Sequence, residues 1–285
     1  MSHELTNIQN ETQPNAQEIL RAGAEFIEHF GIQPSPFEQP EEFLEALKQL
    51  NPRYEGDRNL LRFELEQAHD SNEWPEESRQ IIAQTAESMR MLEPETPLTG
   101  HFDAVIALGG ARMSNLDRAA YAAEAVKSNE AKIDHLIVAG SARKVGDGER
   151  AATDSYAPGA ITEFDLCDAA ADIVRNNYPG LEVRAYPAGD EKAGTPKVIE
   201  SVLRYLKAHG QLSEGSRISV VTTQIYQAST SLDAARVGKL FGVETMAAGN
   251  PSDPKVVDAR TPATYKSEII RTLQAATLAA QAEKQ

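Results

Sequence analysis

The residues best suited to bind or transform a ligand lie in short polar segments that each follow an apolar run. Gly109 and Gly110 come directly after the run 103–108, and Arg112 follows them. A glycine pair lets a ligand approach the backbone because no Cβ stands in the way, and an arginine offers a planar fork of donors to an anion. A tight turn between a strand and a helix explains the same glycines, so both interpretations stay open. The pattern is not G-x-G-x-x-G, so a standard dinucleotide-binding loop is not supported.

A second polar segment starts with Ser141 and Arg143, and Glu163 opens the helical pattern that follows it. Ser141 has no G-x-S-x-G context, so a turn or cap residue is an alternative to a ligand contact. Glu163 follows Thr162, a good N-cap, and its carboxylate either stabilises the helix dipole or faces a ligand. The stretch 144–161 lacks apolar periodicity, which is typical of lids, binding loops and disordered insertions.

A third polar segment, after the apolar run 181–186, contains Glu191, Thr195 and Lys197. Thr195 and the proline after it predict the start of a helix. Glu191 and Lys197 flank that helix N-terminus, where backbone N–H groups favour an anion or a hydroxyl group.

A fourth polar segment, TTQIYQ, contains Thr222, Thr223 and Tyr226 at the end of the apolar run that begins at Ile218. This density of polar groups is unusual for a mere connector. A polar turn is the alternative interpretation.

The elements that must position these segments alternate between two patterns, short apolar runs and longer amphipathic stretches. The apolar runs, which predict strands, are 103–108, 135–139, 181–186, 218–222 and 243–247. The helical patterns lie near 115–128, 162–177, 195–208 and 228–241, with a last one near 262–281. Such alternation predicts right-handed crossovers that bury a parallel sheet between helix layers. The predicted fold class is therefore α/β, with a mostly parallel sheet flanked by helices and an all-α segment before it.

The four polar segments are predicted to form one site. In open parallel sheets, ligands bind beyond the carboxyl ends of the strands, where the loops converge. The candidate catalytic residues, as general acid or base, are Glu163 and Glu191. The candidate ligand-binding residues are Gly109, Gly110, Arg112, Ser141, Arg143, Thr195, Lys197, Thr222, Thr223 and Tyr226.

The residues before about position 100 follow a different pattern. We predict a disordered tail over 1–14, an acidic helical segment over 15–97 and the α/β domain over 98–285. Asn15 with Glu18 fits a capping box at the first helix. Further helical patterns begin after Pro40, around 60–65 and near Pro75.

The formal net charge is −15, and residues 1–100 hold 20 acidic and 7 basic residues against 23 and 21 in residues 101–285. Nucleic-acid binding relies on basic surfaces, so nucleic acid is not expected as a partner. The acidic segment is either a solvated surface or a docking site for a protein partner. The chain shows neither an apolar run long enough for a membrane span nor a secretory signal, so we expect a cytoplasmic protein with no membrane partner.

Several chemistries find no support in the sequence. The six histidines, at positions 3, 29, 69, 101, 135 and 209, show no i, i+4 pair and no H-E-x-x-H motif, so no metal is expected. A G-x-x-x-x-G-K-[ST] phosphate loop is absent, which argues against phosphotransfer of that type. The single cysteine, Cys167, lies in a helical pattern and is expected to be a packing residue rather than a nucleophile.

Taken in order, these motifs resemble those of the YdcF, SanA and ElyC family, a bacterial domain of unknown function. The resemblance covers about residues 102–250 and rests on the glycine pair, the Gly-Ser after the second strand, Thr162 with Glu163, Glu191 with Thr195, and the V-T-T at 221–223. It implies a Rossmann-like α/β fold. Its membrane-anchored branches imply a role in cell-envelope biogenesis. Its cytoplasmic branch, to which this chain is more similar, implies S-adenosylmethionine as a ligand.

The chain departs from the family pattern at two places. Lys197 and Val198 stand where the family has a Glu-Asn pair, and Tyr226 and Ser229 stand where it has a histidine and then an arginine. An imidazole can act as a general base and a guanidinium as an anion clamp. Catalysis that depends on those two groups is therefore not expected here, and whether the chain is an enzyme stays open.

Three functions remain as hypotheses. The first is binding of a nucleotide-like small molecule, with S-adenosylmethionine as the implied ligand, at the carboxyl edge of the sheet. The second is a hydrolase or transferase acting on a phosphorylated or cell-envelope precursor, with Arg112, Arg143 and Lys197 holding anionic oxygens and Glu163 or Glu191 as acid or base. The third is a noncatalytic interaction module whose acidic helical segment binds a protein partner.

Overall fold

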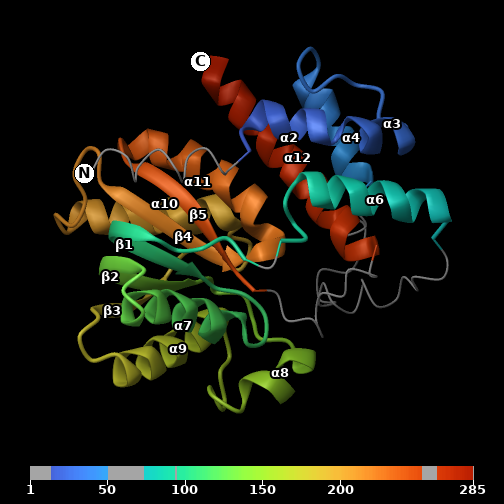
Figure 1. The fold of residues 1–285 in the computed structure, drawn as a ribbon. Coiled ribbons are helices and arrows are strands. Elements are labelled where there is room, and N and C mark those ends of the chain that lie inside the picture. The colour runs from blue at the N-terminus through green and yellow to red at the C-terminus, as the bar shows by residue number, and fades with distance from the viewer. Residues whose placement is uncertain (1–13, 51–73, 94, 252–261, 285) are drawn as a thin grey trace. The chain divides into compact units, whose positions relative to one another are not determined.

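Figure 1 shows the chain as a computed structural model that describes residues 14–50, 74–93, 95–251 and 262–284. The chain divides into two compact units. The first comprises Met1–Pro94 together with Ser252–Gln285, and the second comprises Glu95–Pro251. Within the described ranges, no helix is both long and apolar enough to cross a membrane.

A five-stranded parallel sheet forms the centre of the second unit. Its strands are β1 (Gly100–Leu108), β2 (Ala131–Gly140), β3 (Val183–Pro187), β4 (Arg217–Thr223) and β5 (Glu244–Asn250). They lie in the order β3-β2-β1-β4-β5, and every neighbouring pair is parallel. This is the strand order of a doubly wound, Rossmann-like fold. All five predicted strands and the predicted α/β class are confirmed.

Helices cover both faces of this sheet (Figure 1). The helices α7 (Ser114–Lys127) and α9 (Glu163–Asn177) pack on one face, and α10 (Thr195–Ala208) and α11 (Gln227–Phe241) pack on the other. Alternate side chains of a strand point to opposite faces, so Val221 joins the α7 and α9 core while Val220 joins the α10 and α11 core. The four helices lie where the apolar periodicity predicts them.

The local signals that place these helices are visible in the sequence. Thr162 is the N-cap of α9, and its hydroxyl accepts a hydrogen bond from the Asp165 N–H. Pro196 occupies the first turn of α10, where its missing N–H has no helical partner to lose. Gly242 ends α11 in a left-handed conformation with φ of 69°, which glycine adopts without a Cβ clash.

Of the three interpretations of the stretch 144–161, the structure contradicts the disordered insertion, because the stretch is folded. It contains the short helix α8 (Asp147–Thr153). Val145, Ala157 and Ala160 form a small apolar cluster with Leu166 of α9. The cluster has too few members, spaced too irregularly, to show as periodicity in the sequence.

In the described residues of the first unit, the regular secondary structure is helical. Its helices are α2 (Ala16–Ala22), α3 (Ala24–His29), α4 (Pro40–Leu50), α6 (Glu76–Ser88) and α12 (Pro262–Lys284). The capping box of Asn15 and Glu18 is confirmed, with hydrogen bonds of 2.8 and 3.0 Å. The predicted helix around 60–65 and nearly all of the predicted disordered tail lie outside the described residues.

The last helix differs from the predicted domain boundaries. The alternating pattern assigns it to the α/β domain, but α12 packs against α2, α4 and α6 of the helical unit. Ile269, Leu273 and Ala276 are fully buried there. An amphipathic pattern shows that a helix has an apolar face but not which unit covers it, so the sequence could not place this helix.

Candidate functional site

The candidate site lies where the carboxyl ends of β1 and β4 diverge. The chain winds from β1 through β2 to β3 on one side and returns to β4 on the other, so the loops after β1 and β4 lead to opposite faces of the sheet. This switch point is where open α/β sheets bind ligands. Gly109 follows β1, and Thr223 ends β4.

Arg118 of α7 joins the ends of these two strands. Its Nη1 donates to the carbonyl oxygens of Leu108 at 3.0 Å and Gly109 at 2.5 Å. Its Nε and Nη2 donate to the Thr223 hydroxyl oxygen at 3.2 and 3.0 Å. The ring centroid of Tyr226 lies 5.9 Å from the guanidinium carbon. Arg118 is only 4% exposed, so a buried cation fixes the spacing of the two strand ends.

Arg143 holds two carboxylates at the end of β2. Its Nη1 and Nη2 donate to the two oxygens of Glu149 at 2.8 and 3.1 Å, and its Nε donates to Glu163 Oε1 at 3.4 Å. Burial lowers the pKa of Arg143, but the hydrogen bonds and charges of Glu149 and Glu163 outweigh burial and raise that pKa. The guanidinium therefore stays charged and ties α8 and α9 to the loop after β2.

Ser141 and Glu163 form a hydroxyl–carboxylate pair beside this ion pair. The Ser141 hydroxyl and backbone N–H both donate to Glu163 Oε2, each at 2.8 Å. Arg143 donates its backbone N–H to the Ser141 hydroxyl oxygen at 3.3 Å. Glu163 thus acts neither as a plain first-turn acid nor as an open ligand-facing carboxylate, because it is buried and hydrogen-bonded within the network.

The structure explains the glycine pair by close packing of these charged groups. A Cβ on Gly109 would lie 2.9 Å from the Glu163 carboxyl carbon, and a Cβ on Gly110 would lie 3.0 Å from Arg118 Nη1. The glycines therefore make room for buried side chains of the protein itself. Arg112 follows with φ of 55°, a left-handed conformation that strains a residue with a Cβ.

Asn115 fixes the same loop from α7. Its side chain accepts from the Gly110 N–H at 2.9 Å and donates to the Gly110 carbonyl at 2.8 Å. Its Oδ1 also accepts from the Cys167 thiol at 3.3 Å. Burial raises the pKa of Cys167 well above its ordinary value, so Cys167 is a buried, protonated packing residue.

Part of the predicted site lies elsewhere. Glu191 and Lys197 are exposed, and within the described part of the chain neither side chain makes a hydrogen bond or ion pair. Thr195 begins α10, on the opposite face of the sheet from Glu163. The loop after β3 touches the loop after β2 through the backbone, where the Ala142 N–H donates to the Gly189 carbonyl at 3.3 Å.

The two threonines of β4 lie on opposite faces of the sheet. Thr223 faces α7 and accepts from Arg118, as described above. Because neighbouring residues of a strand face opposite sides, Thr222 lies with Val220 on the face that α10 and α11 cover. The network therefore unites Gly109, Gly110, Ser141, Arg143, Glu163, Thr223 and Tyr226 of the predicted set.

Four residues of the network were missed by the sequence prediction: Asn115, Arg118, Glu149 and Tyr156. A signal existed for the first two, since they recur three residues apart on the apolar face of α7 with Ala119 and Ala122. A polar residue at a buried periodic position needs partners inside the protein. No comparable signal marks Glu149, whose burial depends on the fold of the stretch 144–161.

The network is balanced in charge and suited to holding loops in place. The network holds two arginines and two glutamates: Arg143 pairs with both Glu149 and Glu163, and the two arginines donate to the carbonyls of Leu108, Gly109 and Gly110 at and just after the end of β1. The first N–H groups of α7, which begins beside Gly110, have no partner inside the helix. Of these groups, the Ser114 N–H donates to the Ala111 carbonyl at 3.1 Å. Arg112 and Tyr226 are half-buried residues of the loops after β1 and β4. Among the described residues, no group of three or more His, Cys, Asp or Glu could hold a metal ion.

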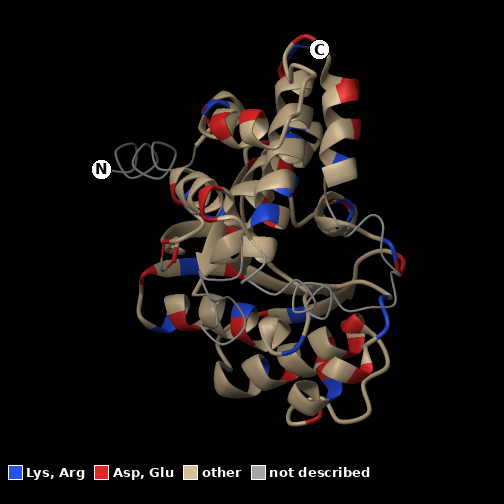
Figure 2. Cartoon of the chain, turned by 90° about the vertical axis from the view of Figure 1, so that its right-hand side faces the viewer, with Lys and Arg blue, Asp and Glu red and all other residues tan. Residues whose placement is uncertain are grey.

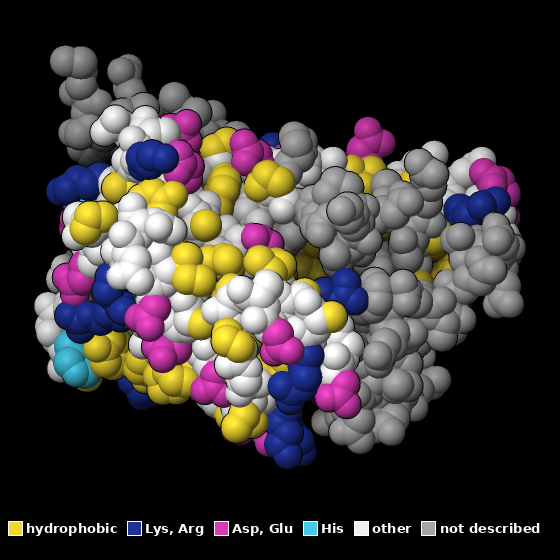
Figure 3. Space-filling model, turned by 90° about the horizontal axis from the view of Figure 1, so that it is seen from below, with side chains coloured by type: hydrophobic (Ala, Val, Ile, Leu, Met, Phe, Trp, Pro, Cys, Tyr) yellow, Lys and Arg dark blue, Asp and Glu magenta, His cyan; other side chains and the backbone are white. Residues whose placement is uncertain are grey.

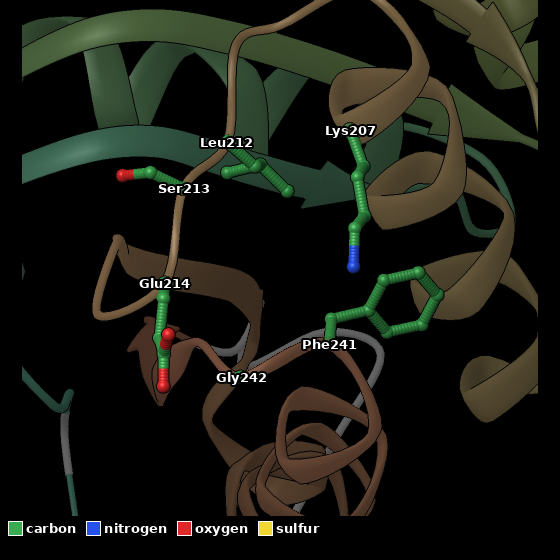
Figure 4. A pocket seen from close by; sticks show the side chains of 6 residues that line it. All are labelled: Lys207, Leu212, Ser213, Glu214, Phe241 and Gly242. Carbon is green, nitrogen blue, oxygen red and sulfur yellow. The ribbon is translucent and has the colours of Figure 1, made fainter.

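A cavity of about 180 Å³ lies at the opposite, amino edge of the sheet (Figure 4). It is lined by Lys207, Leu212, Ser213, Glu214, Phe241 and Gly242. It sits where α10 and α11 end, away from the loops at the carboxyl ends of the strands, and it is smaller than the roughly 300–1,000 Å³ of typical ligand pockets. We therefore place the candidate site at the charged carboxyl edge. Figures 2 and 3 show acidic and basic residues interspersed over two further views of the molecule.

Comparisons with known proteins leave the function open. No family model matches the chain, and no solved structure matches it. The chain is 36% identical over 97 residues to the uncharacterized protein Rv3785 of Mycobacterium tuberculosis and, to the same extent, to the uncharacterized protein Mb3814 of Mycobacterium bovis. The match covers 34% of this chain and only 27% of each relative's length.

Proposed function

We propose that the α/β unit binds a nucleotide-like small molecule at the carboxyl edge of its sheet, between the loop after β1 and the loop after β4. The observation that carries the proposal is the set of buried charged side chains centred on Gly109 and Gly110. A buried charge is costly to keep, and ionisable groups with a perturbed pKa, as Arg143 has, cluster at functional sites. Here the network stands at the edge where this fold class binds its ligands.

The groups in the loops beside the buried network suit such a ligand. The half-buried ring of Tyr226 offers an aromatic face beside Arg118. Arg112 offers a guanidinium, and the start of α7 offers backbone N–H groups. The resemblance to the YdcF, SanA and ElyC family supports S-adenosylmethionine as the first compound to test.

A thermal-shift screen of the full chain tests the proposal. The compounds are S-adenosylmethionine, its demethylated product, ATP and a sugar nucleotide. A compound that binds the folded state raises the apparent melting temperature in a concentration-dependent way. The variant is Arg112→Gly, which removes the guanidinium and also relieves a left-handed backbone conformation.

The matched control is Asn129→Gly, because Asn129 has φ of 61° and lies between α7 and β2, at the amino edge of the sheet. We expect the ligand-induced shift in the wild type and in Asn129→Gly, and its loss in Arg112→Gly. A shift of equal size in all three proteins would contradict the site. The absence of a shift with any compound would contradict the proposed function and direct the search to protein partners.

A further inference from the structure

The stretch 144–161 is built as a flap with a closed base. Lys144 and Thr162 form an antiparallel bridge, and the Val145 N–H donates to the Ile161 carbonyl at 2.9 Å. Above this base the flap packs on its own small apolar cluster and on Leu166, and its Tyr156 also packs against the core on the α7 and α9 face of the sheet. A segment whose ends meet and whose core is small can open as one unit while the rest of the fold stays intact.

Two polar contacts hold the flap against the loop after β1. The Tyr156 hydroxyl donates to the Arg112 carbonyl at 3.0 Å, and Asn115 Nδ2 lies 3.4 Å from the same hydroxyl. The second contact is the bidentate ion pair between Glu149 of the flap and Arg143. Arg143 Nη2 also donates to the Gly110 carbonyl at 3.4 Å. The flap is therefore attached to the candidate site by polar contacts.

The ion pair has the geometry with which an arginine binds a ligand's oxyanion. Both terminal nitrogens of Arg143 point at the two oxygens of one carboxylate, an arrangement that serves for carboxylate and phosphate alike. The Arg143 side chain is 31% exposed, whereas the Glu149 side chain is fully buried beneath its own flap. Arg143 is thus the member of the pair that remains at the edge of the site when the flap moves.

We propose that Arg143 is the oxyanion subsite of the ligand site and that the Glu149 carboxylate occupies this subsite in place of a ligand oxyanion. A phosphate or carboxylate group of the ligand replaces the Glu149 carboxylate on Nη1 and Nη2 and releases the flap 144–161. This inference rests on the proposed function, because it names the chemical class of group that the same site accepts.

The charges and hydrogen bonds support this exchange. Glu163 remains on Nε, so the incoming anion restores the two-carboxylate environment that Arg143 has in this structure. Glu149 keeps a partner after release, because its Oε2 accepts from the Gly146 N–H at 2.8 Å in the capping box that begins α8. The helix of the flap therefore stays intact while its contact with Arg143 is exchanged.

Hydrogen–deuterium exchange of the flap peptides in the full chain tests the proposal. The variants are Glu149→Gln and, as matched control, Asp147→Asn, since Asp147 is an exposed acid of the same helix that pairs with Arg150 at 3.4 Å. Each protein is measured without additive, with inorganic phosphate, with acetate, and with sodium chloride at equal ionic strength.

We expect the flap of Glu149→Gln to exchange roughly tenfold faster or more without additive, because a charge-assisted pair is lost. Phosphate or acetate accelerates exchange in the wild type and in Asp147→Asn beyond the chloride control, and an effect of one anion alone identifies the group. The wild-type measurement needs no substitution, so the test holds even if a variant fails to fold.

Two outcomes separate this inference from the proposed function. If phosphate and acetate leave flap exchange unchanged in the wild type, or slow it, the subsite is refuted, whatever nucleotide-like compounds bind. If they accelerate exchange while no nucleotide-like compound stabilises the chain, the subsite stands and the proposed function fails.

Discussion

The sharpest test of the network compares two neighbouring threonines of β4. Thr223→Val removes the hydroxyl that accepts from Arg118 Nε and Nη2 at 3.2 and 3.0 Å. Thr222→Val makes the same chemical change one residue earlier, on the other face of the sheet. Both residues are buried, and the Thr222 hydroxyl makes no hydrogen bond with another residue in the described ranges. The pair therefore separates the network from the general cost of the substitution.

The expected difference in stability follows from these contacts. A hydrogen bond from a charged donor contributes about 1.5–3 kcal/mol, and a buried donor left without its acceptor costs a similar amount. The two donors of Arg118 share one oxygen, so we count one lost acceptor. Thr223→Val should lower the free energy of unfolding by about 2–3 kcal/mol. Thr222→Val should change it by less than about 0.5 kcal/mol, since the substitution removes no hydrogen bond to another described residue.

Urea unfolding of the two full-length variants, followed by far-UV circular dichroism, gives the measurement. The transition midpoint should fall in Thr223→Val without a change in slope, because the surface exposed on unfolding is the same. Equal destabilisation of the two variants, or greater destabilisation of Thr222→Val, would refute the role of Thr223 as the acceptor that joins Arg118 to β4.

Three further predictions concern the same edge of the sheet. Gly109→Ala should destabilise the chain by about 1–3 kcal/mol, because its Cβ would press on Glu163, whereas Gly180→Ala, whose Cβ meets nothing within 4 Å, should not; urea unfolding compares the two. The Cys167 thiol should not react with a thiol reagent until the chain unfolds, because burial raises its pKa well above the ordinary value; rapid labelling under native conditions would contradict this. Burial raises the pKa of Tyr156 from 10.0 to about 12, so its contribution to stability is complete below pH 10.0 and is lost as the pH rises through about 12. Unfolding measured across this window should show a shallower alkaline loss in Tyr156→Phe, and an unchanged loss would count against the buried phenol.

Sequence reasoning located much of the candidate site because the site follows from strand order. Gly109, Ser141 and Thr223 each stand at the carboxyl end of a strand, and parallel strands bring such ends to one edge. The purpose of the glycines could not be read in this way. A turn, a ligand and a packed side chain all require a missing Cβ, and only the position of Glu163 decides among them.

The residues that the sequence prediction missed or misplaced depend on burial and on contacts, which residue type and spacing do not show. Glu191 stands at a loop like the others, yet it is exposed and joins no contact of the network. Thr222 and Thr223 are alike in sequence, and the pleat of β4 sends them to opposite faces. Glu149 is buried only because the stretch 144–161 folds back on itself and meets Arg143.

Local residue patterns are enough to predict the α/β class, the five strands and most helix starts, because apolar periodicity and caps such as Thr162 and Asn15 act over a few residues. Which residues meet is set by tertiary packing. Arg118 reaches Thr223 across 105 positions of the chain, and α12 joins helices at the other end of the sequence. Contacts of this range depend on how the sheet and helices pack, and no local pattern of residues encodes that packing.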